Sequence, residues 1–181
     1  MHRYRAQLER VLRDANCPEY LEVSRTLRKQ LEPRRPECKQ TVSDFPQLIG
    51  QAVALTERYR AFVDMLSTKT GARAGQAPLK GPWRALEKMV LRPTHTAGDK
   101  TDASLLCDCL RGALDCKDFV AINSVVEMLT WLDDELGDED RVEGIEPRFR
   151  IRLIRLKCRY STPTSGGWAD LLVNFRFADD P

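Results

Sequence analysis

The sequence predicts an α+β fold, in which a mixed sheet flanked by helices follows a mostly helical N-terminal region. The first observation behind this prediction is that apolar residues before residue 67 recur at helical spacing. The second is that two segments near the C-terminus alternate apolar and polar residues, as strands do. The third is the order of elements after residue 81, which runs helix, strand, helix, strand, strand.

Three helices are predicted for the N-terminal region. Apolar side chains follow helical spacing in residues 4–15 and 20–31, and Pro33 and Pro36 then interrupt the pattern. Asp44 is a suitable cap for a long third helix. The apolar stripe of that helix consists of Leu48, Ile49, Ala52, Leu55, Tyr59, Phe62, Val63 and Leu66. We find no catalytic motif in this helix and expect it to pack against the rest of the protein.

Residues 67–81 are rich in Gly, Ala, Ser and Thr, which indicates a linker or mobile loop. Pro82 then fits the first turn of a new helix. The apolar side of this helix is expected to be formed by Trp83, Leu86 and Val90. The character of the chain therefore changes at this point.

A loop, a short strand and a helix are predicted after this helix. A loop is predicted at 93–103, and residues 104–116 are expected to form a short helical turn that enters a buried strand near Arg111–Cys116. Asp118 is predicted to cap the following helix. The apolar stripe of that helix is Ile122, Val125, Val126, Leu129 and Leu132.

Two strands close the sequence, at about 149–160 and at Leu171–Phe177. In the first strand the alternation changes phase, which either a bulge near Leu153–Ile154 or a later start of the strand would explain. The predicted division of the chain is a helical region at 1–70, a linker or mobile loop at 71–81 and a core at 82–181.

The composition is typical of a soluble protein without a membrane anchor. The charged fraction is 31%, no run approaches eighteen apolar residues, and the N-terminus shows no secretory signal. The six cysteines lack the spacing of a zinc site, so they are predicted to be reduced and mostly buried: Cys17, Cys38, Cys107, Cys109, Cys116 and Cys158. The expected location is the cytoplasm or another reducing intracellular compartment.

Charge is arranged in blocks near the C-terminus. Residues 131–146 hold eight acids and one base, and residues 147–159 hold six bases and no acid. Arg155, Lys157 and Arg159 would share one strand face, where like charges repel unless acids or a bound anion lie between them. The acidic block could supply those acids, so a salt-bridge role and a ligand role both stay open.

Lys80, Arg84 and Lys88 recur every four residues, so a helix would place them in one row. Three cations beside a glycine-containing loop suit the binding of a polyphosphate. The simpler interpretation is a solvated helix face with Glu87 nearby, and from spacing alone that interpretation is favoured.

Two further positions stand out. Asp108 lies in an apolar run, where a carboxylate needs a partner. A metal ion could be that partner; the simpler explanations are that Asp108 caps the N-terminus of a helix or pairs with a residue such as Arg111. Residues 164–168 form a turn with two glycines that ends on Trp168. That ring could pack against the protein or stack on a nucleobase.

In this order the motifs resemble the synthetase domain of the RelA/SpoT family, a nucleotidyltransferase-type domain. Lys80, Arg84 and Lys88 fall at the spacing of the family's helix that grips ATP phosphates, with Arg84 in the place of a serine. Residues 104–116 resemble the family's aspartate segment, with Asp108 in the position of the Mg²⁺ ligand.

The most specific part of the resemblance lies near the C-terminus. Lys157, Pro163 and Trp168 look like the family's strand lysine, its proline and the aromatic residue of its glycine–tyrosine turn. Lys157 and Pro163 are six residues apart, and Pro163 and Trp168 are five. Trp168 would take the place of the tyrosine that stacks on the acceptor guanine.

The resemblance implies a pyrophosphokinase that moves pyrophosphate from ATP to the 3′-hydroxyl of a guanosine nucleotide, with Mg²⁺ at Asp108. The residues that would hold phosphates are Lys80, Arg84, Lys88, Lys157 and Arg159. Divergent relatives act on other nucleotides or on RNA ends, so an RNA acceptor is a further expectation. No membrane partner is expected, and the N-terminal helices could contact a protein partner.

The sequence also departs from the family pattern. An arginine expected five residues after the aspartate is replaced by Ala113, and Asp170 and Leu172 replace a serine and a histidine. The family's second metal ligand, a glutamate in a Glu-x-Gln strand, would lie after Pro181, so the resembling core is expected to be incomplete. The alternative is therefore a catalytically inactive module of the same fold that binds nucleotides or a protein.

Overall fold

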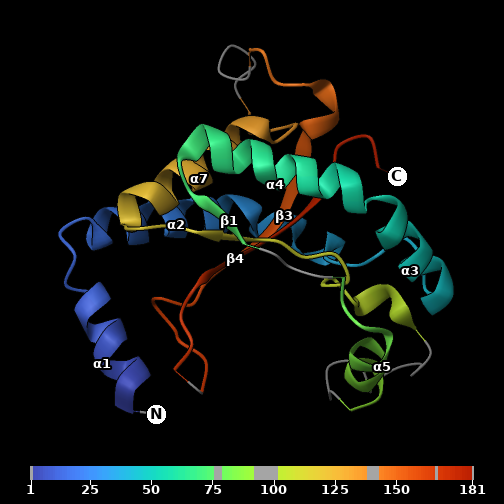
Figure 1. The fold of residues 1–181 in the computed structure, drawn as a ribbon, viewed down its shortest axis with the longest axis horizontal. Helices are drawn as coiled ribbons and strands as arrows, with labels where there is room; N and C mark the ends of the chain where they lie inside the picture. Colours follow the sequence, from blue (N-terminus) through green and yellow to red (C-terminus); the bar gives the residue numbers. More distant parts are fainter. Residues whose placement is uncertain (1, 76–78, 92–101, 138–142, 166, 181) are drawn as a thin grey trace. The chain divides into compact units, whose positions relative to one another are not determined.

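The computed structural model describes residues 2–75, 79–91, 102–137, 143–165 and 167–180. The α+β class is confirmed, because helices alternate with two small antiparallel sheets (Figure 1). Each sheet contains two strands, in the pairs β1–β2 and β3–β4, so the described strands form two separate pairs where one mixed sheet was predicted. Within the described residues, no helix has the length and apolar character needed to cross a membrane.

The chain divides into two compact units. Unit 1 combines residues 1–35 with residues 116–181, and unit 2 consists of residues 36–115. Unit 2 contains 11 basic and 9 acidic residues, whereas unit 1 contains 18 of each. The net charge of +2 therefore belongs to unit 2.

The helices of unit 1 follow the predicted caps and breaks. They are α1 (His2–Val11), α2 (Cys17–Leu31), the 3₁₀ helix η1 (Glu32–Glu37), α7 (Phe119–Leu132) and the 3₁₀ helix η4 (Pro147–Phe149). Asp118 caps α7 as predicted, because its side chain accepts a hydrogen bond from the Ala121 amide at 2.8 Å. Four of the five residues predicted as the α7 stripe are buried, and Ile122 is partly buried.

The sheet of unit 1 is a hairpin of β3 (Ile151–Cys158) and β4 (Leu171–Phe177), drawn in orange and red in Figure 1. Its register shifts between Leu153 and Arg155, so of the two explanations offered for the change in alternation, a bulge or a later start of the strand, the bulge is the correct one. The bulge lets Ile151, Leu153, Ile154 and Leu156 all be buried although they do not alternate.

Unit 1 packs around an aromatic cluster that joins α2 and α7 to the hairpin. The Tyr20 ring stacks on Phe119 with a centroid distance of 4.7 Å, and Tyr160 meets both rings edge-on at 5.6 and 5.3 Å. The Tyr20 hydroxyl also contacts Cys158 Sγ at 3.3 Å. Such ring pairs add to the stability that burial of apolar area provides.

A buried ion pair ties η1 to the end of α7 and to the β3 bulge. Arg34 donates to Asp133 at 2.6 and 3.1 Å and to the Leu153 carbonyl at 2.9 Å. Asp133 also accepts hydrogen bonds from the amides of Leu153, Glu135 and Leu136 at 2.7, 3.0 and 2.8 Å. Both members of the pair are buried, so each needs these partners.

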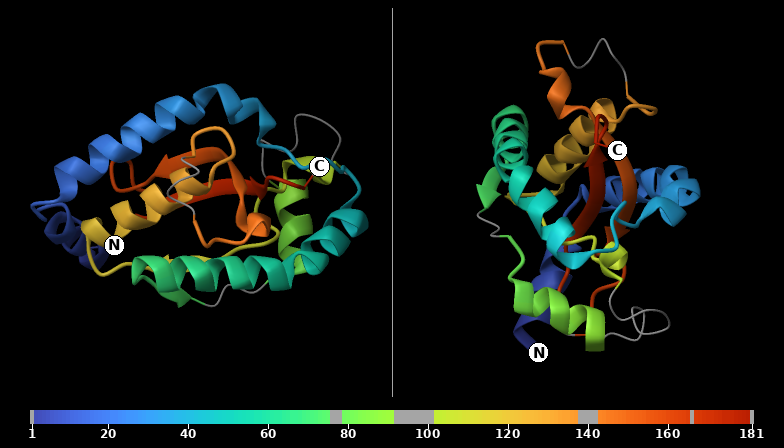
Figure 2. Two further views of the ribbon diagram at one scale, coloured as in Figure 1. Left: turned by 90° about the horizontal axis from the view of Figure 1, so that it is seen from above. Right: turned by 90° about the vertical axis from the view of Figure 1, so that its right-hand side faces the viewer.

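Unit 2 begins with two helices where one was predicted. These are α3 (Phe45–Ala54) and α4 (Thr56–Thr70), and Figure 2 shows a change of direction between them. Asp44 caps α3 as predicted, because it accepts from the Gln47 amide at 2.8 Å. Gly71, with φ of 70°, caps α4 in the left-handed conformation. The predicted stripe still faces inward in part, since Leu48, Ala52, Phe62 and Leu66 are buried.

The second sheet pairs β1 (Arg73–Gly75) with β2 (Ala113–Asp115). Strand β1 lies inside the segment predicted as a linker or mobile loop. Strand β2 follows the 3₁₀ helix η2 (Ala103–Leu105), as predicted for residues 104–116. The prediction that this strand is buried was wrong, because the ends of β2 are exposed. Its exposed end carries an ion pair between Arg73 and Asp115 at 2.7 Å.

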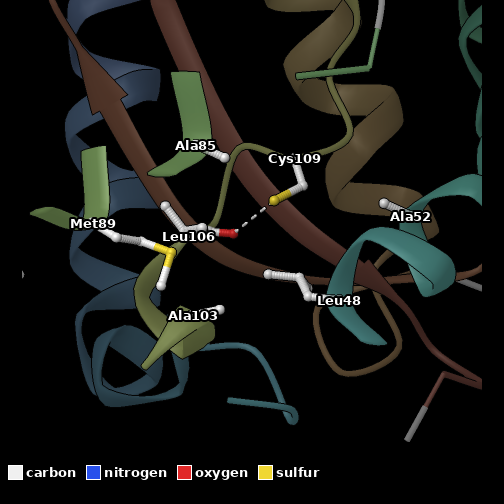
Figure 3. Packing of buried hydrophobic residues seen from close by; sticks show 7 residues of the cluster. All are labelled: Leu48, Ala52, Ala85, Met89, Ala103, Leu106 and Cys109. Carbon is white, nitrogen blue, oxygen red and sulfur yellow. Dashed lines mark hydrogen bonds between the residues drawn. The ribbon is translucent and has the colours of Figure 1, made fainter. Parts of the chain in front are cut away.

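Helix α5 (Pro82–Leu91) starts at Pro82 as predicted, but it turns a different side to the core. Ala85 and Met89 are buried, and in Figure 3 they point toward Leu48, Ala103, Leu106 and the other residues of one cluster. The predicted apolar side was wrong: Trp83, Leu86 and Val90 are 84, 36 and 48% exposed. Small and flexible side chains at 85 and 89 let α5 approach the loop that carries Asp108. The predicted loop at 93–103 lies mostly outside the described residues.

Candidate anion-binding pocket

A pocket of about 430 Å³ lies in unit 2 between α5 and the loop that follows η2. Charged side chains dominate its lining, which consists of Lys80, Gly81, Arg84, Glu87, Lys88, Leu91, Asp108 and Arg111. Among the described residues of this lining, four are cationic and two are carboxylates, which leaves an excess of two positive charges. Such an excess favours an anionic ligand.

The centre of the pocket is a carboxylate held between two ammonium groups. Lys80 Nζ lies 2.7 Å from Asp108 Oδ2, and Lys88 Nζ lies 2.8 Å from Asp108 Oδ1. The lysine side chains are only 10 and 16% exposed, and the Asp108 side chain is 37% exposed. Removing an ammonium group from water costs free energy. Two buried ammonium groups at one site therefore require a neutralising anion, which is either this carboxylate or a ligand.

Local structure explains why these three side chains meet. The Lys80 amide donates to the Cys109 carbonyl at 2.9 Å, which joins the chain two residues before α5 to the residue after Asp108. Helix α5 then places Lys88 two turns further along the same side. The buried cluster beneath, with Met89 and Cys109 among its members, fixes α5 against the Asp108 loop.

Burial and hydrogen bonding act in opposite directions on Asp108. Burial alone would raise the pKa of Asp108, but hydrogen bonds from Lys80 and Lys88 outweigh it and hold the pKa below its usual value. The Cys109 thiol next to it is buried, and burial together with the Asp108 charge raises the pKa of that thiol. At neutral pH the pocket therefore contains a charged carboxylate, and the thiol of the next residue, buried in the apolar cluster, stays protonated.

The other cations occupy the exposed rim. Arg84 Nη1 lies 3.2 Å from Glu87 Oε2, and both side chains are exposed. Arg111 lines the pocket from the Asp108 loop and is also exposed. Exposed ion pairs of this kind contribute little to stability, so Arg84 can change partner at low cost.

The residues of this pocket do not fit a metal site built by the chain in the arrangement seen. Each Asp108 oxygen accepts a hydrogen bond from an ammonium group, and lysine has no lone pair to offer a metal. Among the residues that the structure describes, no three His, Cys, Asp or Glu side chains gather in a group that could hold a metal ion. The expected Mg²⁺ at Asp108 therefore stays a prediction from the resemblance.

The remaining predicted site residues belong to unit 1. Lys157 is exposed on β3, opposite Leu172 in the hairpin register. Arg159 grips Asp170 with two hydrogen bonds, Nε to Oδ1 at 2.5 Å and Nη2 to Oδ2 at 2.7 Å. Trp168 is 55% exposed, and its Nε1 donates to Asp170 Oδ2 at 2.8 Å.

The turn that carries Trp168 has the predicted need for glycine. Gly167 has a φ of 80°, and its amide donates to the Thr164 carbonyl at 2.8 Å. The Trp168 amide donates to Thr164 Oγ1 at 3.1 Å. The indole is thus held at its polar edge by Asp170, while more than half of the residue is exposed.

The contacts of the cations and of Asp108 differ from the simplest interpretation of the sequence. The solvated-face interpretation describes Arg84 and Glu87, but Lys80 and Lys88 are mostly buried and converge on Asp108. The expected partner of Asp108, Arg111, lines the same pocket, while the hydrogen bonds come from the two lysines. The row of cations and the isolated aspartate are therefore parts of one site.

The acidic block was predicted as a possible source of partners for Arg155, Lys157 and Arg159, but Arg155 and Arg159 bond to Asn174 and Asp170, which lie outside that block. Acids of the block pair with another residue of β3. Arg152 pairs with Glu135 and lies 3.6 Å from Asp134. Arg155 instead donates to Asn174 Oδ1 at 3.0 and 2.9 Å. Sequence reasoning missed Arg34 as the buried partner of Asp133; the only signal for it is a basic residue next to prolines in a helix-ending segment.

No protein-family model, curated protein or solved structure matches the chain. The class of protein therefore rests on the fold and the site alone: an α+β protein with a cationic pocket.

Proposed function

We propose that this protein binds the phosphate groups of a nucleotide, or of another polyphosphate, in the pocket of unit 2. The observation that carries the proposal is the pair of mostly buried ammonium groups, Lys80 and Lys88, that share one carboxylate. A phosphate chain offers several anionic oxygens to the same donors, and Arg84 and Arg111 stand at the rim to bind the rest of it.

Charge supports a polyanion over a single phosphate. A ligand must displace Asp108 from both lysines before it can bind them. A ligand with one or two negative charges replaces the ion pairs that Asp108 already makes, so its net binding free energy is small. A triphosphate brings more negative charge than the two positive charges in excess, and its outer oxygens can reach the arginines. We therefore expect affinity to rise from orthophosphate to pyrophosphate to tripolyphosphate.

The test is a calorimetric titration of the full chain with sodium tripolyphosphate, ATP and GTP, each with and without Mg²⁺. Saturable binding of tripolyphosphate that weakens steeply with added salt supports the proposal. Sulfate at the same ionic strength controls for a general preference for anions. The absence of any saturable signal for all three ligands at low salt would overturn it.

The second candidate is the pyrophosphokinase activity implied by the resemblance to RelA/SpoT synthetases, on a nucleotidyltransferase-like fold. It is favoured by one observation: the three cations that the resemblance assigns to ATP phosphates, Lys80, Arg84 and Lys88, line one pocket with Asp108, which the resemblance assigns to Mg²⁺. In this proposal the lysines and Arg84 would hold ATP phosphates, and Trp168 would stack on the acceptor base.

Turnover distinguishes the two candidates. The full chain is incubated with labelled ATP, Mg²⁺ and GDP, GTP or tRNA, and products are separated by chromatography. Transfer of labelled pyrophosphate supports the enzyme, whereas nucleotide binding without any product supports the inactive nucleotide-binding module.

A further inference from the structure

Two cysteine thiols of unit 2 lie in contact although they are 69 residues apart in the sequence. Cys38 Sγ and Cys107 Sγ are 3.8 Å apart, and the Cys107 thiol also donates to the Cys38 carbonyl at 3.3 Å. Neither thiol is part of a disulfide, and both are partly exposed. Small reagents can therefore reach this pair.

The backbone holds the two thiols in register. The chain segments that carry them are joined by three hydrogen bonds: Gln40 N to Ser104 O at 2.6 Å, Ala103 N to Ser43 O at 2.8 Å, and Gln40 Nε2 to Leu106 O at 3.0 Å. These bonds lie within a few residues of both cysteines. The proximity of the sulfur atoms thus follows from the paired segments and does not depend on two flexible side chains alone.

We propose that Cys38 and Cys107 are a redox site that forms a reversible disulfide by exchange with a small-molecule disulfide such as glutathione disulfide. One cysteine thiolate attacks a sulfur of the reagent, forms a mixed disulfide and releases one thiol. The second cysteine then attacks the protein sulfur of the mixed disulfide and releases the other thiol. Two protein thiols are oxidised and one small disulfide is reduced to two thiols, so electrons and protons balance.

The geometry requires only a small movement. A disulfide bond is about 2.0 Å long, so the sulfur atoms must approach by roughly 1.8 Å, which rotation of the side chains and a slight shift of the loops can supply. The buried thiols are less suited to this exchange. Burial raises the pKa of the Cys17 and Cys109 thiols, which keeps them protonated and unreactive.

The bond would join the residue immediately before Asp108 to the segment after η1 (Glu32–Glu37). It would also close a loop of 69 residues, which restricts the unfolded chain and raises the melting temperature. Reduction would reverse both effects.

The test equilibrates the full chain in glutathione buffers that range from fully reduced to fully oxidised, then blocks remaining thiols and maps disulfides by mass spectrometry. We expect a peptide linkage between Cys38 and the segment of Cys107 that grows with the oxidised fraction and disappears with dithiothreitol. Cys109 lies in the same tryptic peptide, so Cys109→Ala is the matched control and should retain the linkage. Cys38→Ser and Cys107→Ser should lose it.

The readout does not involve nucleotide binding, so it stands whether or not the pocket binds a polyphosphate. No linkage in the wild-type chain under glutathione disulfide alone would overturn the proposal. So would a product that stays as mixed glutathione adducts, or a linkage that survives in Cys107→Ser and vanishes in Cys109→Ala. A higher melting temperature of the oxidised wild-type chain, reversed by dithiothreitol, would support it.

Discussion

Among single residues, the contact on which the proposed function depends is the sharing of Asp108 by Lys80 and Lys88. Each lysine gives up hydration when it is buried and recovers part of that free energy from a charge-assisted hydrogen bond. The same two donors are the ones that a phosphate would need. Asp108 therefore competes with any anionic ligand, and this competition leads to two predictions of opposite sign.

Removal of a lysine should weaken binding. Lys80→Met or Lys88→Met keeps the length of the side chain but removes a charge-assisted hydrogen bond worth about 1.5–3 kcal/mol, so the Kd for tripolyphosphate should rise by about 10- to 100-fold. Calorimetry measures the change. Lys69→Met, an exposed lysine on α4, is the control for loss of one charge and should change Kd by less than about threefold.

Removal of the carboxylate should act in the other direction. Asp108→Asn ends the competition for the lysines, so we expect tripolyphosphate to bind about tenfold more tightly. The same change leaves Lys80 and Lys88 with a weaker partner and should lower the free energy of unfolding by about 1–3 kcal/mol. Loss of affinity in this variant would instead show that Asp108 contributes to ligand binding, as the predicted role in holding Mg²⁺ requires.

The buried pair Arg34–Asp133 gives a prediction about pH. Burial alone would raise the pKa of Asp133, but hydrogen bonds from Arg34 and three backbone amides hold it below its usual value. An acid with a lowered pKa in the folded state stabilises the protein above its unfolded pKa of about 3.9, and this contribution is lost as the pH falls through the folded pKa.

Asp133→Asn should therefore lower the free energy of unfolding by about 3–5 kcal/mol at pH 7, because Arg34 stays buried without its charged partner. The difference from the wild-type protein should shrink as the pH falls below 4. Urea unfolding at pH 7 and pH 3 measures both. Asp134→Asn is the neighbouring exposed control and should cost less than about 1 kcal/mol; a difference independent of pH would contradict the explanation.

At the scale of elements, the close approach of the chain before β2 to α4 depends on a glycine. A Cβ at Gly112 would lie 2.8 Å from Tyr59 Oη and 2.9 Å from Val63 Cγ2, which is closer than side-chain atoms can pack. Burial raises the pKa of Tyr59 to about 12, while a backbone hydrogen bond with Gly112 lowers it slightly. The glycine therefore lets β2 lie directly against the helix.

Gly112→Ala should lower the free energy of unfolding by about 1–3 kcal/mol, because α4 and the segment before β2 must move apart. Gly50→Ala is the matched control in α3, where a Cβ would meet no atom within 4 Å. That change should stabilise the protein by about 0.5–1 kcal/mol, since alanine favours the helix. Chemical unfolding of both variants checks the two signs, and a stabilising Gly112→Ala would show that the contact is loose.

At the scale of the whole molecule, the chain folds into one unit made of two distant segments and one unit made of the continuous segment between them. The excess positive charge and the pocket both belong to the continuous unit. A ligand of the pocket should therefore act on unit 2.

Hydrogen exchange can test this expectation on the intact chain. A ligand that binds only the folded state at 100 times its Kd stabilises the unit that binds it by about 2.7 kcal/mol. With tripolyphosphate at that level, we expect slower exchange in α5 and in residues 102–115, and little change in the β3–β4 hairpin. Equal protection of both units, or protection around Trp168 alone, would contradict the assignment of the pocket.

Much of the local structure could be predicted from the residues alone. The caps at Asp44 and Asp118, the end of α2 before the prolines and the bounds of β4 were all predicted, because caps, proline and alternation act through neighbouring residues. The bulge in β3 was also visible as a change in alternation. Asp108 could be named in advance because a charge in an apolar run requires a partner, and Lys80 and Lys88 because they recur at helical spacing.

The contacts between residues far apart in the sequence could be seen only in the folded chain. Trp83 was predicted to face the core but is exposed, because α5 turns Ala85 and Met89 toward the buried cluster. The pairing of strands into two sheets, the partner of Asp133 and the contact between Cys38 and Cys107 all join residues far apart in sequence. Helical spacing and alternation carry no information about such contacts, since these depend on the packing of whole elements.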